Sequence, residues 1–223
     1  MIVAVTTVLN EAPILGETVT HLLDRNVDWV VISDGGSTDG TRDLIGTFPR
    51  TTLLDQDGPL YQDQEMTRLA HHAYQLGTDW VIPFDADEYW CDLHLLDAAP
   101  PDVGVVYATV WQHSTRTLRH TTPKRLPKVA FRPNADMWIH WGNHYVDNIP
   151  GRAATGLNIR ELQYRDYDHY LAKIDRAARL YATADFPAQY GVHLRRLVAM
   201  SDTERKQEWA AMQAVPTVYD PIP

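Results

Sequence analysis

The chain has 223 residues, of which 44% are hydrophobic and 22% are charged. These values are close to those of ordinary globular domains, so the composition argues against a disordered chain and against a membrane protein. The 20 Lys and Arg residues against 29 Asp and Glu leave a formal net charge of -9, which disfavours non-specific attraction to nucleic acid or anionic lipid. The length fits one compact domain, and we expect a single domain over residues 1–223.

Three features bear on the cellular location. No apolar run reaches the about 20 residues that are needed to cross a bilayer. The opening stretch "MIVAVTTVLNEAP" meets Asn10 and Glu11 too early for a secretory signal, and the single cysteine, Cys91, cannot form an intramolecular disulfide. We therefore expect a cytoplasmic protein without an integral membrane segment.

The first 90 residues alternate between apolar runs typical of strands and stretches with helical spacing. Pro13 favours the first turn of a helix, and Gly77 is suited to ending one. The predicted elements are a strand over 2–9, a helix over 13–23, a strand over 29–33, a helix capped by Ser37, Thr38 or Asp39, a strand over 52–54, a helix over 64–76 and a strand over 80–84.

Beyond residue 100 the pattern is less regular. We predict strands over 103–111 and 128–132 and helices over 168–184 and 194–212. The stretch "PNADMWIHWGNHYVDNIPG" is aromatic and rich in histidine but has no clear periodicity. The tail "VPTVYDPIP" contains too much proline to continue a helix.

Strands that alternate with helices predict an α/β fold with parallel pairing through right-handed crossovers. Ligands in such sheets bind beyond the carboxyl ends of the strands. The polar segments 10–11, 34–36 and 85–88 each follow a predicted strand. Parallel pairing would therefore bring all three to one edge of the sheet, where one pocket can hold them.

The segment "VIPFDADEYW" places Asp85 and Asp87 one residue apart, on the same side of an extended chain. Two such carboxylates can jointly hold a hard divalent cation or a ribose hydroxyl, and magnesium or manganese would bridge them to a diphosphate. For an isolated D-x-D sequence, a pair of solvated loop acids is the more frequent explanation. The segment "SDGGSTDGT" has a comparable alternative, a glycine-rich turn with a helix cap, and it matches neither the P-loop nor the G-x-G-x-x-G pattern.

Taken together, "VTTVLNEAPILGETVTHLL", "WVVISDGGSTDGTRDLI" and "TDWVIPFDADEYW" resemble, in order and spacing, the family 2 glycosyltransferases with the GT-A fold. Farther on, "KVAFRP", "WGNHYV" and "LQYRDYDHYLAKI" resemble later motifs of a subgroup marked by a DADE-type metal motif, so the resemblance covers about residues 1–180. It implies a GT-A nucleotide-diphospho-sugar transferase fold, with a mostly parallel central sheet flanked by helices and with C-terminal helices. The nucleotide-binding half would span about 1–90, and the acceptor-binding and C-terminal part about 91–223.

The resemblance also implies an activity, namely metal-dependent transfer of a sugar from a nucleotide-sugar donor to an acceptor hydroxyl, with inversion. Mn²⁺ or Mg²⁺ would be the cofactor, held by Asp87 together with Asp85 and His144. Asp34 would hydrogen-bond the base and Asp85 would face the ribose. The residues expected to meet the nucleotide-sugar are Thr6, Val8, Asn10, Glu11, Asp34, Gly35, Arg68, Asp85 and Ala86.

For the catalytic residues we expect Asp147 as the general base with Asp136 behind it, and Glu88 near the donor sugar. His140 is the alternative base. Tyr89 and Trp90 either form an apolar wall on which a sugar stacks or pack into the core.

Two features are not part of that pattern. Glu161 stands where the subgroup commonly has a histidine, four residues before the arginine of the "YR" motif. The basic stretch "STRTLRHTTPKRLPK" can position an anionic acceptor, even a nucleic acid, but we favour a solvated loop.

Two other functions are compatible with this sequence. A nucleotidyltransferase shares the fold and the two-acid metal site, but the loop "LNEAPILGE" lacks the lysine expected of a triphosphate-binding loop. A non-catalytic nucleotide- or carbohydrate-binding module is the second alternative. As acceptor for a glycosyltransferase, we expect a small molecule or a glycan precursor, because the chain is close to a bare catalytic domain in length.

Overall fold

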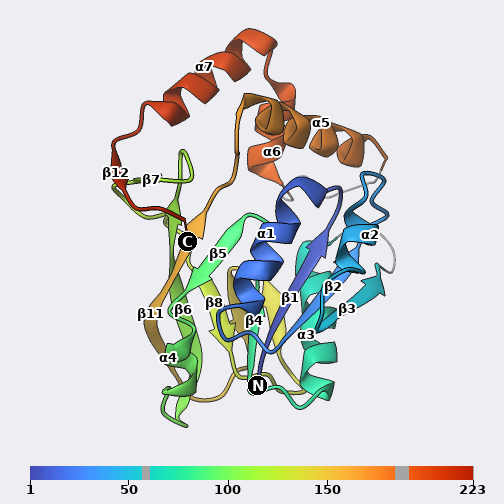
Figure 1. Ribbon diagram of the computed structural model, residues 1–223, viewed down its shortest axis with the longest axis vertical. Helices are drawn as coiled ribbons and strands as arrows, with labels where there is room; N and C mark the ends of the chain where they lie inside the picture. The colour runs from blue at the N-terminus through green and yellow to red at the C-terminus, as the bar shows by residue number, and fades with distance from the viewer. Residues whose placement is uncertain (57–60, 184–190, 223) are drawn as a thin grey trace. The chain divides into compact units, whose positions relative to one another are not determined.

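The computed structural model describes residues 1–56, 61–183 and 191–222 (Figure 1). The described chain divides into two compact units, the first made of Met1–Trp111 and Thr122–Glu161, and the second of Gln112–Thr121 and Leu162–Ile222. We describe each unit by itself, and the single domain expected over 1–223 stays a prediction.

The helices are α1 (Ala12–Leu23), α2 (Thr41–Ile45), α3 (Gln62–Gln75), α4 (His94–Asp97), α5 (Tyr167–Thr183), α6 (Val192–Ala199) and α7 (Asp202–Gln213). The strands are β1 (Ile2–Val8), β2 (Trp29–Asp34), β3 (Thr51–Asp55), β4 (Trp80–Pro83), β5 (Glu88–Cys91), β6 (Val103–Gln112), β7 (Leu118–His120), β8 (Lys128–Phe131), β9 (Trp138–His140), β10 (Tyr145–Asp147), β11 (Arg152–Glu161) and β12 (Thr217–Tyr219). In the described part of the chain, none of the helices combines the length and the apolar character that crossing a membrane requires.

The main sheet of the described residues has the strand order β3-β2-β1-β4-β8-β6-β11-β5. The strands β3, β2, β1 and β4 pair in parallel, whereas β4 with β8, β8 with β6, and β11 with β5 pair antiparallel. Val8 lies opposite Asp34, so the loops after β1 and β2 leave the sheet at the same edge. The predicted α/β class and the predicted shared edge are therefore confirmed.

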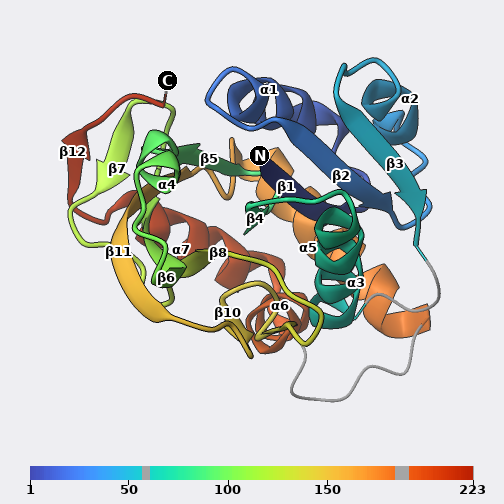
Figure 2. The ribbon, with the colours of Figure 1, turned by 90° about the horizontal axis from the view of Figure 1, so that it is seen from below.

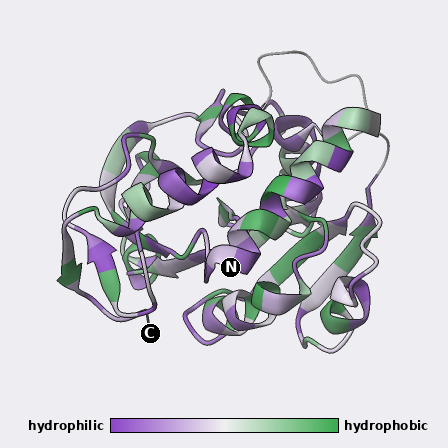
Figure 3. Ribbon diagram, turned by 90° about the horizontal axis from the view of Figure 1, so that it is seen from above, coloured by the Kyte–Doolittle hydropathy of each residue, from purple (hydrophilic) through white to green (hydrophobic). Residues whose placement is uncertain are grey.

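Helices cover both faces of the parallel half of the sheet. Figure 2 shows α1 and α2 on one face of β1–β3 and α3 on the other. Leu15 and Leu22 of α1 pack with Ile32 in one buried cluster. Met66 and Leu69 of α3 belong to a second buried cluster, together with strand side chains from the opposite face of the sheet. Burial on both faces explains why these strands are continuous apolar runs, which Figure 3 shows as mostly hydrophobic ribbons.

Local signals in the sequence set several boundaries. Pro13 lies in the first turn of α1, where its missing N–H has no helical partner to lose. Gly77 follows α3 with a φ of 77°, a left-handed conformation that glycine adopts without strain. The predicted cap of α2 by Ser37, Thr38 or Asp39 is wrong, because Gly40 is the N-cap with a φ of 92°. Asp39 lies one residue earlier, and its carboxylate accepts a hydrogen bond of 3.0 Å from the Thr41 amide.

The structure differs from the sequence-based prediction mainly beyond residue 84. The strands β5, β7, β9, β10, β11 and β12 and the short helix α4 were not predicted. The single helix predicted over 194–212 is wrong, because α6 ends at Ala199 and α7 begins after a capping box in which Ser201 and Glu204 bond to each other's backbone amides. The residue Ala184 of the other predicted C-terminal helix lies outside the described residues.

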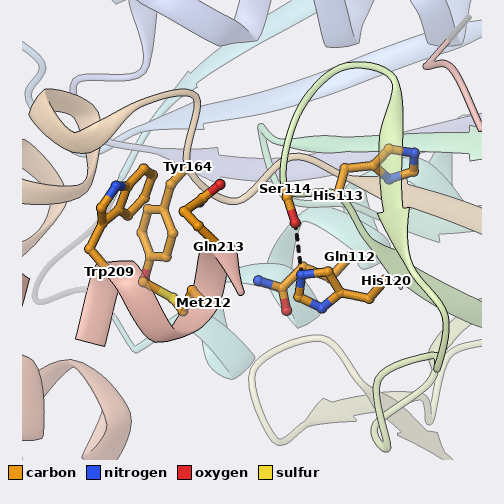
Figure 4. A pocket seen from close by; sticks show the side chains of 8 residues that line it. All are labelled: Gln112, His113, Ser114, His120, Tyr164, Trp209, Met212 and Gln213. Atoms are coloured by element: carbon orange, nitrogen blue, oxygen red, sulfur yellow. Dashed lines mark hydrogen bonds between the residues drawn. The ribbon is translucent and has the colours of Figure 1, made fainter. Parts of the chain in front are cut away.

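The second unit has its own aromatic cluster. The ring of Tyr170 lies 5.1 Å from that of Tyr164 and 5.5 Å from that of Trp209. Figure 4 shows a small pocket of this unit, with Tyr164, Trp209 and Met212 on one side and Gln112, Ser114 and His120 on the other. The His120 ring and the Ser114 hydroxyl are 3.1 Å apart.

In the first unit, α1 holds the segment that follows β4. The Thr18 hydroxyl donates to the Ala86 carbonyl at 2.5 Å, and the Tyr89 hydroxyl donates to Glu17 at 3.0 Å. His21 Nε2 lies 2.7 Å from the Trp90 carbonyl oxygen. Three α1 side chains therefore fix the position of the segment Asp85–Glu88, which we call the acidic segment, and of the two aromatic residues that follow it.

His21 makes this anchoring sensitive to pH. Arg25 Nε donates to His21 Nδ1 at 3.2 Å, so the ring is neutral and its Nε2–H donates to Trp90. Burial lowers the pKa of His21 below its ordinary value of 6.5, and the nearby Arg25 and Arg160 lower it further, against the opposing effect of the Trp90 carbonyl.

We predict that His21 makes the fold less stable as the pH falls below 6.5, because the unfolded chain then binds a proton that the folded chain takes up less readily. The free energy of unfolding, measured in urea at about pH 7.5 and about pH 5.5, should fall by less in His21→Gln than in the wild type. An equal fall in both proteins would contradict the prediction.

Candidate active site

The loops after β1 and β2 are bonded to each other. The Asn10 amide donates to the Ser37 hydroxyl at 2.8 Å, and the Thr38 amide donates to the Asn10 side-chain oxygen at 2.7 Å. The Gly35 amide donates to the Val8 carbonyl at 2.9 Å. We call these bonded loops, residues 9–11 and 35–39, the paired loops.

Asp34 lies beneath the paired loops and is buried. Its Oδ1 accepts from both the amide and the hydroxyl of Ser37, at 3.2 and 2.5 Å, and Arg42 lies 3.6 Å from its Oδ2. In the described structure this carboxylate therefore holds the turn, and its hydrogen bond to a base stays a prediction.

The other predicted nucleotide-binding residues are placed around the same edge. Thr6 and Val8 are buried, and their contact with a nucleotide stays a prediction. The Glu11 amide donates to the Thr41 hydroxyl at 2.9 Å. A Cβ at Gly35 would lie 2.9 Å from the Gln56 side-chain oxygen, so glycine permits this close packing.

Arg68 is on α3 at the end of β3. Its guanidinium makes a two-pronged contact with Glu65, at 2.9 and 2.6 Å, and donates to the Asp55 carbonyl at 3.1 Å. The arginine therefore ties α3 to the carboxyl end of β3, and its predicted contact with phosphate stays a prediction.

Asp85, directly beyond β4, is held by three donors from distant segments. Its Oδ2 lies 2.7 Å from the Lys128 ammonium, and its Oδ1 accepts from the side-chain amides of Gln62 at 3.1 Å and Asn143 at 3.0 Å. The side chain is 36% exposed, so part of the carboxylate remains accessible to a ligand.

Lys128 is only 2% exposed and lies inside the acidic group. Its ammonium is 2.7 Å from both Asp85 and Glu88, and it donates to the Asn143 side-chain oxygen at 2.5 Å. Burial alone would lower the pKa of Lys128, but the carboxylates of Asp85 and Glu88 outweigh burial and raise the pKa above its ordinary value. The lysine is therefore charged at neutral pH.

Glu88 is fully buried at the start of β5. Its Oε2 accepts from the Asp85 amide at 3.1 Å, which closes the turn of the acidic segment. Burial, with the neighbouring charges of Asp85 and Glu161, raises the pKa of Glu88 to about 8 against the opposing effect of Lys128. The hydrogen bond between the Glu88 side chain and the Asp85 amide holds the turn of the acidic segment. The predicted contact of Glu88 with the donor sugar stays a prediction.

Glu161, the departure from the subgroup pattern, lies beside this acidic segment. It pairs with Glu88 across β11 and β5, and the Lys124 ammonium lies 2.8 Å from its Oε1. Burial raises the pKa of Glu161, and among its neighbours Asp87 raises it while Lys124 lowers it. Asp87 and Ala86 are both buried next to it.

The solvated-loop interpretation of the basic stretch is wrong for three of its members. Lys128 and Lys124 are paired with acids of the first unit. Arg119, in the second unit, lies on β7 and forms an ion pair of 2.9 Å with Asp220.

The "WGNHYV" motif reaches the acidic segment through Asn143 rather than through His144. The side chain of His144 donates from Nδ1 to the Pro127 carbonyl at 2.7 Å, and burial, aided by Lys128, lowers its pKa. The imidazole is therefore neutral with Nε2 as an acceptor, a form that can ligate a metal. We call the β9–β10 element the hairpin and residues 141–144 its tip.

The predicted base Asp147 lies at the other end of the hairpin, opposite Trp138. Its carboxylate is 3.4 Å from His140 Nε2, so the two candidate bases form one pair. Asp136 is exposed in the turn before the hairpin, where its carbonyl accepts from the Asn148 side chain at 2.8 Å.

A divalent cation fits the chemistry of this edge, although the described residues contain no group of three or more His, Cys, Asp or Glu arranged around a cation. Magnesium and manganese prefer carboxylate oxygens, and in nucleotide sites they take one or two carboxylates plus substrate phosphates rather than a complete protein cage. Asp85 and Asp87 supply carboxylates at this edge, with Asp85 the more exposed of the two, and Asp87 as a metal ligand stays a prediction.

Sequence patterns did not single out Lys128, Gln62 or Asn143 as functional. The available signals were a lone lysine opening the apolar run "KVAF" and an amide directly before His144. Neither has a spacing that identifies its partner, because Lys128 and Asn143 are 43 and 58 residues from Asp85 in the chain.

The half-parallel sheet with helices on both faces and acidic residues beyond its strands has the architecture of an α/β enzyme fold. The model of the family described as glycosyl transferase family 2 matches residues 3–155. The chain therefore belongs to glycosyltransferase family 2, and the resemblance and the enzyme class predicted from sequence are confirmed. Comparison with curated protein sequences gave no match.

Solved structures resemble this fold at low identity. A structure of S. aureus TarS 1-349 is 14% identical, with 96% of this chain and 81% of that chain covered and a TM-score of 0.53. A longer S. aureus TarS structure is 15% identical with a TM-score of 0.52, over 91% of this chain and 44% of that one, so the chain spans less than half of it. These likenesses confirm the predicted GT-A fold.

A third structure, glucosyl-3-phosphoglycerate synthase from Mycobacterium tuberculosis with Mn²⁺, UDP and phosphoglyceric acid, is 21% identical. The match covers 49% of this chain and 43% of that one, with a TM-score of 0.36.

We predict that Lys128→Met lowers the free energy of unfolding by about 3–5 kcal/mol, because it leaves the buried Glu88 and the partly exposed Asp85 without their cation. The matched control is Arg152→Met, since Arg152 pairs with Asp102 at an exposed position, where a loss of about 1 kcal/mol or less is expected. Urea unfolding measures both. Equal losses in the two variants would contradict the role of the buried ammonium.

Proposed function

We propose that the protein is a metal-dependent glycosyltransferase that transfers a sugar from a nucleotide-sugar donor to an acceptor hydroxyl with inversion. The observation that carries this proposal is the acidic segment Asp85–Glu88 of a family 2 chain, which lies at the same sheet edge as the paired loops. Nucleotides bind at such an edge because the loops beyond parallel strands converge there.

In this proposal the paired loops and Asp34 bind the nucleoside, and Asp85 bonds the ribose through its accessible surface. Because Lys128, Gln62 and Asn143 already fix the Asp85 carboxylate, it meets the ribose without losing further side-chain freedom. Arg68 lies at the carboxyl end of β3, where it can reach a phosphate.

Asp87 holds the Mn²⁺ or Mg²⁺ ion, with Asp85 and His144 as the further candidate ligands. When bound, the ion supplies positive charge that offsets the charge of the departing diphosphate. Lys128 and Glu88 keep the turn between the two aspartates in one shape.

For the acceptor we propose the hydroxyl of a small molecule or a glycan precursor. The pair formed by Asp147 and His140 takes the proton from that hydroxyl, with Asp147 as the base and Asp136 in support. His140 lies between Asp147 and the tip, so the pair serves an acceptor that lies along the hairpin. A nucleic-acid acceptor is disfavoured because Lys124 and Lys128 are engaged by the buried acids Glu161 and Glu88.

The two other functions are less well supported. A nucleotidyltransferase needs a basic loop after β1, whereas the loop here, "LNEAPILGE", contains two glutamates and no lysine. A non-catalytic binding module would bind donors without hydrolysing or transferring the sugar. The cytoplasmic location expected from the sequence stays a prediction.

We predict that Asp87→Asn reduces kcat/KM for sugar transfer by about a hundredfold or more, because one ligand of the leaving-group cation is weakened. UDP-, GDP-, CMP- and dTDP-sugars, each with and without Mn²⁺, identify the donor by a thermal shift. The variant should lose the Mn²⁺-dependent part of the shift. Asp97→Asn, at the end of α4, is the control and should behave as the wild type.

Unchanged turnover in Asp87→Asn would refute the metal role of this residue. Binding of a donor with no hydrolysis or transfer to any acceptor would favour the binding module instead.

We further predict that Asp147→Asn lowers kcat for transfer by about a hundredfold, while hydrolysis of the donor by water and donor binding change little, because only the acceptor needs a base. Asp136→Asn should have a much smaller effect on kcat. A larger loss in Asp136→Asn than in Asp147→Asn would reverse the two assignments.

A further inference from the structure

The aromatic residues next to the acidic segment do not reach a ligand. Tyr89 and Trp90 are 1% and 0% exposed, which confirms core packing as their role. A sugar at this edge therefore needs an apolar surface from elsewhere in the first unit. The hairpin supplies an aromatic side chain that faces solvent, since Trp141 at its tip is 68% exposed.

The hairpin is fixed in place by three contacts. The Ile139 amide donates to the Thr67 hydroxyl of α3 at 2.9 Å, and His144 donates to the Pro127 carbonyl at 2.7 Å. At the tip, buried Asn143 donates to Asp85 at 3.0 Å. Trp141 is therefore two residues from a direct contact with the acidic segment.

The backbone at the tip is strained in a way that turns Trp141 outward. Trp141 has a φ of 55° and Gly142 a φ of 76°, both in the left-handed region. This conformation is unusual for a bulky residue, and such strain is concentrated at ligand-binding sites. Burial does not compensate for it, because the indole is exposed.

The outer face of the hairpin continues this surface. Tyr145 pairs with His140 and Asp147 with Trp138, so these four side chains lie on one face while Ile139 faces the core. The rings of Tyr145 and His140 are 5.7 Å apart, and Trp141 meets Tyr145 edge-on at 6.2 Å. Aromatic rings beside a carboxylate and an imidazole match the apolar face and the hydroxyls of a sugar ring.

The charge of the outer face of the hairpin favours neutral ligands over anionic ones. Residues 138–147 contain no Lys or Arg, and Asp147 is their only charged group when histidine is neutral. Such a surface does not attract phosphates or anionic lipid, so a neutral carbohydrate fits it better.

The hairpin lies outside the main sheet and packs against α3. Its tip reaches the acidic segment through Asn143. A pyranose on the outer face of the hairpin would therefore approach the acidic segment along the tip.

We propose that the outer face of the hairpin, with Trp141 as its platform, binds a neutral pyranose of the acceptor. This inference rests on the proposed glycosyltransferase function, because only a glycosyltransferase has an acceptor to which the pyranose belongs. The binding of a pyranose itself can be tested without a donor. Trp141 stacks on the apolar face of the ring, and Asp147 with His140 meets its hydroxyls.

The test is saturation-transfer NMR with methyl β-D-glucopyranoside, methyl β-D-N-acetylglucosaminide and methyl α-D-mannopyranoside, without donor or metal. Glycerol serves as a polyol without a ring. The proteins are the wild type, Trp141→Ala, Trp141→Phe and Trp29→Ala. Trp29→Ala is the matched control, because Trp29 is a partly exposed tryptophan at the amino end of β2, away from the carboxyl edge that carries the candidate site. Urea unfolding checks that each variant is folded.

We expect saturable binding of at least one glycoside and none of glycerol. Trp141→Ala should weaken that binding by about threefold to tenfold, Trp141→Phe should retain most of it, and Trp29→Ala should equal the wild type. In transfer assays Trp141→Ala should raise KM for the acceptor by the same factor and leave donor hydrolysis unchanged.

Equal binding by the wild type and Trp141→Ala would overturn the proposal, as would the absence of binding for all three glycosides. Loss of binding to phosphatidylglycerol vesicles in Trp141→Ala, without glycoside binding, would assign the surface to a membrane instead. Failure of every nucleotide-sugar to bind would refute the proposed function alone, because glycoside binding needs no donor.

Discussion

The arrangement of the candidate site depends on one buried ammonium group. Lys128 contacts Asp85, Glu88 and Asn143 at once, with only 2% of its surface exposed. Without this cation, carboxylates crowded at the end of a buried strand would repel one another and lose their hydration. With it, Asp85 and Glu88 are held in one arrangement at the carboxyl edge of the sheet.

The parallel half of the fold could be predicted because each of its elements carries its own signal. The apolar runs of β1, β2 and β4 are buried on both faces, and Pro13 and Gly77 mark helix ends through backbone constraints that act locally. The shared edge followed from parallel pairing alone. The position of the two aspartates at the carboxyl edge of the sheet could therefore be predicted from the sequence.

The remaining elements depend on contacts that no local pattern encodes. β5 begins with Glu88, a charged residue that is buried only because Lys128 meets it. β11 has mixed exposure along its length, and β9 and β10 have three residues each, too few for a period to be visible. The partners of Asp85 are likewise defined by the fold, since they come from α3, β8 and the tip of the hairpin.

The bonds between the two loops beyond β1 and β2 limit how this scaffold can be re-engineered. Asn10 both donates to Ser37 and accepts from Thr38, so neither loop keeps its shape if the other is exchanged. A graft of one loop from a related enzyme would break these hydrogen bonds and leave partly buried polar groups of the other loop without their partners. Altering the choice of nucleotide therefore requires transplanting both segments as one module, and sequence libraries should vary them jointly.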